Sequence, residues 1–328
     1  MKFASLRCED PDGRLLLVSR DATRALDASM VVPNLLTALQ RWDDVAPTLQ
    51  GLSDRLNDGS YPATFAFDAH ACGAPLPRSF QWCDASAFLQ HGRLMEQAFN
   101  TPPIPDFDTV PVMYQGASDD FLGARDTVPL PDESLGIDFE GEFGVVLASV
   151  PMGATPGAAH ERIRLMVQIN DWSLRALGPR EMKSGFGFLQ AKPSTSFAPL
   201  AITPDELGGN WRDGRVQLNL EVHLNDVPFG RPHGGEMNFS FGQLIAHAAR
   251  TRKLSAGTVI GSGTVSNQSR EAGSACISER RVIEIIESGE PRTPFMRFGD
   301  QVRMAATDAH GGRPFGIIDQ RVVRAGQG

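Results

Sequence analysis

A short apolar segment of the chain reads Gly136-Ile137-Asp138-Phe139-Glu140-Gly141-Glu142-Phe143-Gly144-Val145-Val146, with acidic residues inside it. In an extended strand the side chains alternate between two faces, so Glu140 and Glu142 share one face, and Phe139, Phe143 and Val145 share the other. Two neighbouring carboxylates repel each other, and when partly buried they either raise their pKa values or bind a cation. The alternative is an exposed edge strand with a solvated acidic face, and the Glu-x-Glu pattern alone favours that alternative.

The composition is that of a globular protein. The chain has 328 residues, 41% hydrophobic and 21% charged, so we expect two domains or one large domain with an appendage. No apolar segment approaches the ~20 residues of a membrane span, and the first residues lack a signal-peptide core, which predicts a cytoplasmic protein without a membrane partner. A net charge of −8 without a Lys/Arg cluster argues against a nucleic-acid partner. Four cysteines lack Cys-x-x-Cys spacing and are expected to be reduced structural thiols: Cys8, Cys72, Cys83 and Cys276.

Residues 1–75 are expected to form a small N-terminal α+β domain. A hairpin is predicted for residues 2–18, and apolar residues at helical spacing predict two helical segments between residues 35 and 56. The glycine and prolines of residues 70–77 predict a linker. Residues 76–328 are then expected to form the larger domain.

The larger domain is expected to be mainly sheet. Residues 216–223 alternate apolar and polar side chains, and residues 298–304 and 315–323 read as closing strands. Residues 240–252 are amphipathic and predict a helix, whereas residues 276–284 are compatible with either a strand or a helix.

Asp84 and His91 stand seven residues apart in a segment, residues 79–99, whose apolar residues recur at helical spacing. In a continuous helix, seven residues make two turns, which would place both side chains on one side about 10 Å apart, near one ligand-sized cavity. The alternative for such an isolated pair is a solvated helix face.

Further polar candidates stand in loops or at strand ends, where binding groups are common. They are Tyr114, Arg125, Asp171, Arg175, Lys192 and Thr264. Taken singly, each has an ordinary explanation: Asn170-Asp171 is typical of a turn, a lone lysine is usually solvated, and Gly261-Ser262-Gly263-Thr264 is typical of a tight turn. The glycines of that turn would also let backbone N–H groups approach a ligand closely.

The order of these motifs, from Gln81 to Val323, resembles the fumarylacetoacetate hydrolase family. The resemblance implies an α+β fold whose larger domain is a mixed β-roll, mainly β, and a homodimer. It also implies a divalent metal held by four carboxylates, with His91 as the catalytic base. The ligand positions are Asp84, Glu140, Glu142 and Asp171. Four oxygen ligands suit a hard cation, Mg²⁺ before Ca²⁺ or Mn²⁺, and not zinc.

The same resemblance implies a substrate with a 1,3-dicarbonyl unit whose carbon-carbon bond is cleaved by water. Lys192 would offset negative charge, and a glutamate would orient His91; Glu279 is the candidate, with Glu284 as the alternative. Substrate contacts are expected from Tyr114, Arg125, Arg175 and Thr264.

The resulting functional prediction is a metal-dependent hydrolase of fumarylacetoacetate or a related acylpyruvate in aromatic or tyrosine catabolism. One site of this kind can also serve other reactions, so two enzymatic alternatives remain: an oxaloacetate-type 2-oxo acid decarboxylase and a 2-oxo-enoate hydratase or isomerase. A third alternative is a family member that binds a small molecule without catalysis.

Overall fold

The computed structural model describes residues 1–100 and 102–326. The strands are β1 Lys2–Leu6, β2 Arg14–Val18, β3 Arg24–Asp27, β4 Phe65–Ala66, β5 Trp82–Ala85, β6 Met113–Gly116, β7 Val128–Leu130, β8 Ile137–Asp138, β9 Gly141–Leu147, β10 Ile163–Asn170, β11 Ser173–Leu174, β12 Ser196–Phe197, β13 Ala201–Ile202, β14 Trp211–Arg212, β15 Arg215–Val216, β16 Asn219–Leu224, β17 Val227–Gly230, β18 Val259–Gly261, β19 Gln301–Thr307 and β20 Ile318–Arg324. The α-helices are α1 Leu35–Gln40, α2 Trp42–Asp58, α3 Leu89–Phe99, α4 Pro156–His160, α5 Gly178–Ser184, α6 Phe241–Ala248 and α7 Ile277–Ser288. Short 3-10 helices are η1 Glu133–Leu135, η2 Pro204–Asn210, η3 Gly234–Glu236 and η4 Arg270–Ala272.

The larger sheet of the described residues has the strand order β4-β3-β2-β1-β13-β10-β9-β18-β5-β6, with β12 paired to β10. Strand β9 therefore lies inside the sheet, antiparallel to both β10 and β18. Glu140 is 5% exposed and Glu142 is 0% exposed. The solvated edge strand that the Glu-x-Glu pattern favoured is wrong, because β10 and β18 pair with the two edges of β9.

The opposite face of β9 packs on a second sheet with the order β17-β16-β19-β20-β7. Phe143 lies 6.2 Å from Phe315 between ring centroids. A Cβ on Gly141 would come within 2.7 Å of Leu220 Cδ2, so the second sheet leaves room only for glycine between Glu140 and Glu142.

Alternation in residues 216–223 correctly predicted part of the second sheet. The apolar residues of this segment are all buried: Val216, Leu218, Leu220 and Val222. Both sheets contain parallel and antiparallel pairs, since β5 runs parallel to β18 and β20 runs parallel to β7. The α+β fold with mixed sheets is confirmed.

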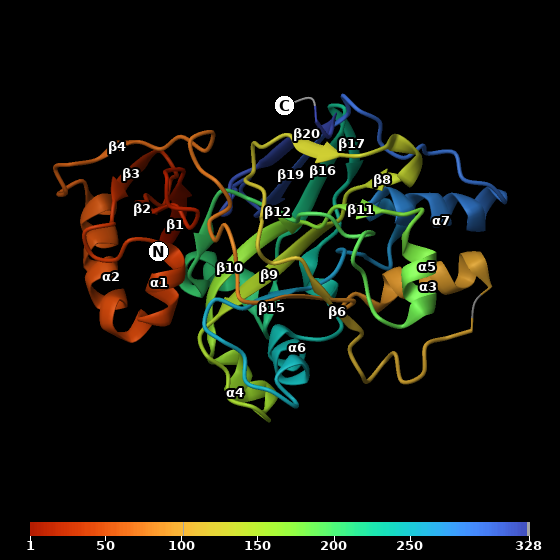
Figure 1. The fold of residues 1–328 in the computed structure, drawn as a ribbon, viewed down its shortest axis with the longest axis horizontal. Helices are drawn as coiled ribbons and strands as arrows, with labels where there is room; N and C mark the ends of the chain where they lie inside the picture. Colours follow the sequence, from red (N-terminus) through yellow and green to blue (C-terminus); the bar gives the residue numbers. More distant parts are fainter. Residues whose placement is uncertain (101, 327–328) are drawn as a thin grey trace.

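The N-terminal elements follow the predicted hairpin and helices. Strands β1 and β2 are antiparallel, and α1 and α2 cover them at one end of the molecule (Figure 1). The break between the helices falls at Arg41, and α2 ends at Gly59, which has φ 80° as expected of a C-terminal glycine cap. Strand β1 also pairs with β13, so the larger sheet continues through both parts of the chain. The division at residue 75 stays a prediction.

The single helix predicted for residues 79–99 is wrong. The segment forms strand β5, which ends at Ala85, and then helix α3, which begins at Leu89. Strand β5 hydrogen-bonds to β18 on one side and β6 on the other, and this long-range pairing outweighs the local helical spacing. Asp84 and His91 therefore belong to two different elements, and the two-turn helical spacing between them does not exist.

Residues 276–284, which the sequence left open between strand and helix, lie in helix α7, with Cys276 as its N-cap. Helix α7 packs on α3, and both lie with α5 at the end of the molecule opposite α1 and α2 (Figure 1). No helix in the described part of the chain is long and apolar enough to cross a membrane.

Candidate active site

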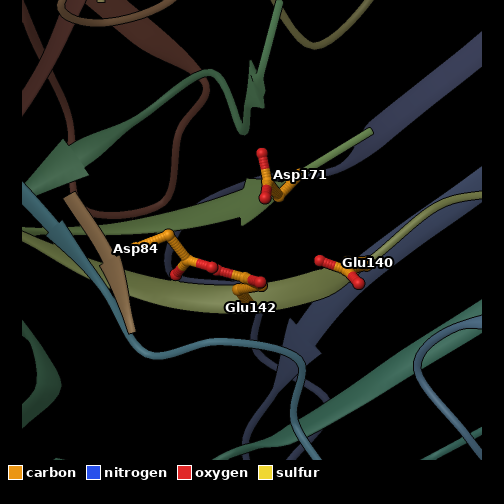
Figure 2. A group of neighbouring side chains, drawn as sticks. All are labelled: Asp84, Glu140, Glu142 and Asp171. Atoms are coloured by element: carbon orange, nitrogen blue, oxygen red, sulfur yellow. The ribbon is translucent and has the colours of Figure 1, made fainter. Parts of the chain in front are cut away.

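Four carboxylates meet at the centre of the larger sheet. Asp84 lies on β5, Glu140 directly precedes β9, Glu142 is the second residue of β9, and Asp171 follows β10. One oxygen from each lies within 4.8 Å of the others, and all four side chains are buried. Figure 2 shows the four side chains gathered at one place from these separate segments. The residues predicted as metal ligands are thus brought together, although their role stays a prediction.

Strand register explains why these residues meet. Glu142 pairs with Ile169, and the N–H of Asp171 donates to the carbonyl of Glu140 at 2.9 Å. On the other side of β9, Gly261 pairs with Asp84. Strands β10, β9 and β5, with β18 between β9 and β5, therefore bring the acidic side chains to one point.

The burial of Glu142 is hard to explain without a cation. No N–H or alcohol group of the described residues donates to either of its carboxylate oxygens. Burial, together with neighbouring Asp84 and Asp171, raises the pKa of Glu142 well above its ordinary value. Burial and the charge of Asp171 likewise raise the pKa of Asp84 to about 8. A hard divalent cation would satisfy these oxygens, so the donor set fits the predicted metal.

Glu140 behaves differently because cations lie beside it. Lys192 Nζ donates to Glu140 Oε2 at 2.5 Å, and Arg175 Nη2 donates to Oε1 at 2.6 Å. Burial opposes ionisation of Glu140, but the charges of Lys192 and Arg175 outweigh it and hold the pKa at about 2. Burial similarly opposes the charge of Lys192, but Asp171 and Glu140 raise its pKa above the ordinary value. Glu140 is therefore anionic and Lys192 is protonated.

Asp171 is oriented by three donors. Tyr114 Oη donates to Oδ2 at 2.5 Å, Lys192 Nζ donates to Oδ2 at 2.7 Å, and Thr195 Oγ1 donates to Oδ1 at 2.8 Å. Burial and the charge of Asp171 raise the pKa of Tyr114 well above its ordinary value, so its hydroxyl remains a donor. Thr195 was not among the residues predicted from the sequence. It stands three residues after Lys192, which was predicted, and both donate to Asp171.

His91 pairs with Glu279 across the contact between α3 and α7. The Nδ1 atom of His91 lies 2.8 Å from Glu279 Oε2, and Glu279 is 1% exposed. Glu284 instead accepts backbone N–H groups of Arg292 and Thr293 near the other end of α7. Of the two glutamates that the sequence left open, the structure places Glu279 against His91.

Of the residues predicted to contact substrate, some lie beside the carboxylate cluster and others do not. Arg175 contacts the cluster, with its Nε donating to Asp138 and its Nη2 to Glu140. Arg125 instead pairs with Asp319 at 2.8 Å, and none of its hydrogen bonds within the described residues reaches the cluster. Thr264 is buried in the turn after β18. Their roles in substrate binding stay predictions.

The turn before Thr264 supports Asp84 directly. The N–H of Gly263 donates to Asp84 Oδ1 at 3.0 Å. Gly263 has φ +76°, and a Cβ at this position would lie 2.1 Å from the carbonyl oxygen of Ala85.

We expect Gly263→Ala to destabilise the protein by about 2–4 kcal/mol, because left-handed strain and a backbone clash add together. It should also weaken metal binding, because the turn can then no longer hold Asp84. Thermal unfolding and metal titration check both effects. Gly153→Ala is the matched control, since Gly153 has φ +75° and nothing within 4 Å of the added Cβ. Equal losses of stability in the two variants would contradict the clash.

Two family models match the chain. Residues 81–323 match the model described as fumarylacetoacetate (FAA) hydrolase C-terminal, and residues 1–78 match fumarylacetoacetase N-terminal domain 2.

Curated relatives and solved structures are also similar to parts or all of the chain. A 2,4-didehydro-3-deoxy-L-rhamnonate hydrolase of Sphingomonas sp. is 27% identical over 49% of this chain and 54% of its own length. An uncharacterised protein of Archaeoglobus fulgidus is 25% identical over 56% of this chain and 66% of its own length. The chain thus spans between half and two thirds of these relatives.

The fold likeness extends over nearly the whole chain. Maleylpyruvate hydrolase of Sphingobium sp. SYK-6, in complex with manganese(II) and pyruvate, has a TM-score of 0.66 at 14% identity, covering 99% of this chain and 100% of that one. Fumarylacetoacetate hydrolase of Exiguobacterium antarcticum has a TM-score of 0.66 at 16% identity, covering 99% of each chain.

Proposed function

Since the chain belongs to the fumarylacetoacetate hydrolase family, we propose that it is a metal-dependent hydrolase. Its substrate would be fumarylacetoacetate or a related acylpyruvate, cleaved at a carbon-carbon bond in aromatic or tyrosine catabolism. The observation that carries the proposal is the buried four-carboxylate cluster, in which Glu142 lacks a donor among the described residues, with the His91–Glu279 pair nearby. The two are linked through the backbone, because Glu140 lies opposite Cys276, the N-cap residue of the helix that carries Glu279.

The named relatives support this choice of chemistry. Three of them are named as hydrolases, of 2,4-didehydro-3-deoxy-L-rhamnonate, maleylpyruvate and fumarylacetoacetate, and the maleylpyruvate hydrolase was solved with manganese and pyruvate. Pyruvate is the product expected when an acylpyruvate is cleaved next to its 2-oxo acid unit. A divalent ion, Mg²⁺, Mn²⁺ or Ca²⁺, is therefore proposed for the cluster.

The chain's own residues can perform the proton transfers of this hydrolysis. When bound by the four carboxylates, a divalent ion would supply Lewis acidity to the substrate's oxygens. Glu279 accepts from Nδ1–H of His91, which leaves Nε2 to take a proton from water. Water adds to the carbonyl, the carbon-carbon bond breaks with its electron pair on the departing carbon, and protonated His91 returns a proton to that carbon. Lys192 offsets the negative charge of Glu140 and Asp171.

The test is a substrate panel with and without metal. We expect an acylpyruvate to be cleaved with a higher kcat/KM than that for oxaloacetate decarboxylation, because loss of CO₂ needs no base beside the metal. Chelator should abolish activity, and Mg²⁺ or Mn²⁺ should restore it. Metal should also stabilise the native state by about 2.7 kcal/mol when present at 100 times its Kd.

The outcomes separate the alternatives. Full turnover by metal-free protein would remove the metal from the reaction. Faster oxaloacetate decarboxylation that survives loss of His91 would favour the decarboxylase, and isomerisation of a 2-oxo-enoate without cleavage would favour the isomerase. Metal binding without turnover of any substrate would favour the non-catalytic alternative.

A further inference from the structure

Asp138 lies beside the cluster but is not one of its four carboxylates. It is 0% exposed. Its Oδ1 accepts from the N–H of Ile277 at 2.7 Å, and its Oδ2 accepts from the N–H of Ser278 at 2.8 Å and from Arg175 Nε at 2.8 Å. A buried carboxylate is costly unless it is paired and hydrogen-bonded, and here both oxygens are engaged.

Two of these donors belong to the first turn of α7. The first N–H groups of a helix have no partner within the helix, and their partial positive charge favours an anion. Asp138, from the separate strand β8, satisfies the first two of them. The next residue along the helix is Glu279, whose N–H donates to Cys276 Sγ at 3.2 Å. The carboxylate is therefore bonded to the backbone immediately before the residue that contacts His91.

The start of α7 is also bonded to the segment around Glu140, one of the four clustered carboxylates. Glu140 lies opposite Cys276 in an antiparallel bridge, and the N–H of Gly141 donates to the carbonyl of Ala275 at 2.9 Å. Arg175 connects Asp138 to Glu140 through its two donors. The start of α7 and the strand that bears Glu140 are thus joined by backbone and side-chain bonds.

We propose that Asp138 is a positioning residue: its carboxylate fixes the first turn of α7 to the strand that carries Glu140, and so holds Glu279 against His91. The inference rests on the proposed function, because it concerns the residue that orients the base. A shift of about 1 Å at the start of α7 would stretch the 2.8 Å contact between Glu279 and His91 and could cost on the order of 10²-fold in rate.

The first test is Asp138→Asn, which keeps the shape but replaces one acceptor oxygen by an NH₂ group that faces a backbone N–H. Nitrogen NMR of ¹⁵N-histidine-labelled, metal-free protein at mildly alkaline pH reports the tautomer of His91, with the His91→Gln spectrum for assignment. We expect one tautomer in the unsubstituted protein and a mixture in Asp138→Asn. With metal, kcat should fall about 10- to 100-fold, while KM and metal affinity change by about twofold or less.

A second pair of variants leaves Asp138 untouched. Ile277 is the first residue of α7, a position that tolerates proline. Ile277→Pro removes the N–H that donates to Asp138, and Ile277→Val retains that N–H with a side chain of similar volume to proline. We expect the tautomer mixture and the lower kcat in Ile277→Pro but not in Ile277→Val.

These outcomes decide the inference even if one variant fails to fold. A single His91 tautomer with unchanged kcat in Asp138→Asn, or equal behaviour of Ile277→Pro and Ile277→Val, would overturn it, since Asp138 would then act on stability alone. If the unsubstituted protein cleaves no acylpyruvate, the proposed function fails, but the tautomer comparison in metal-free protein still tests the positioning role.

Discussion

His91→Ala is expected to lower kcat for acylpyruvate cleavage by about 10²- to 10⁴-fold, which is typical for loss of a general base. Metal binding should survive, because His91 contacts Glu279 and is not one of the four clustered carboxylates. Steady-state kinetics with saturating metal, together with a metal titration, measure the two effects separately.

Glu279→Gln extends this prediction to the orienting residue. The amide can no longer offer a carboxylate to Nδ1–H, so the base loses its fixed tautomer and kcat should again fall strongly. Glu284→Gln is the matched control on the same helix, since the Glu284 side chain accepts from Arg292 and Thr293 near the far end of α7. Its kcat should be unchanged. Normal turnover in His91→Ala, or equal losses in the two glutamine variants, would remove the pair from the mechanism.

Glu142→Gln is expected to have opposite effects on the protein with and without metal. In metal-free protein it removes a buried carboxyl that lacks a donor among the described residues, so stability near neutral pH should rise by about 1–3 kcal/mol. With metal, the variant should lose a ligand, and the Kd should rise by about 10²-fold or more. Denaturant unfolding with chelator and metal titration provide the two readouts.

The stabilising effect should grow with pH. The folded-state pKa of Glu142 is raised above its ordinary value, mainly by burial, so the folded protein binds this proton more tightly than the unfolded chain does. The stability that this carboxyl contributes is fully present below its pKa in the unfolded chain, about 4. It is lost as the pH rises towards its pKa in the folded protein. Glu142→Gln lacks this loss, so its advantage over the unsubstituted metal-free protein should increase from acidic to neutral pH.

A remote glutamate provides the control for this prediction. Glu221→Gln removes a carboxylate on β16 that is paired with Arg231 outside the cluster, and it should change neither the metal affinity nor the sign of the pH dependence. Unchanged metal affinity in Glu142→Gln would mean that the carboxylate is not a ligand.

The local sequence pattern correctly predicted secondary structure where an element forms from residues close together in sequence. Strands β1 and β2 are joined by one short turn, and α2 ends before the glycine cap Gly59. Along β16, the apolar positions of the sequence pattern are the buried ones. The order of the polar motifs was also enough to select the four carboxylates that the structure brings together.

The spacing of apolar residues could not predict which distant segments pair as strands. Asp84 was expected on a helix, but β5 pairs with β18, about 175 residues later in the chain, and becomes a strand. The Glu-x-Glu pattern by itself favoured an exposed edge strand, but β10 and β18 cover both sides of β9.

The sequence alone therefore determined the four acidic residues, the base and the lysine, and the family that they indicate. These depend only on residue type and on order along the chain. The sequence could not choose between Glu279 and Glu284, nor assign a position to Asp138 or a partner to Arg125. Those outcomes follow from how α7 and β20 pack against segments far away in sequence. Hydrogen bonds over such separations form only when the whole chain has folded, and no local spacing encodes them.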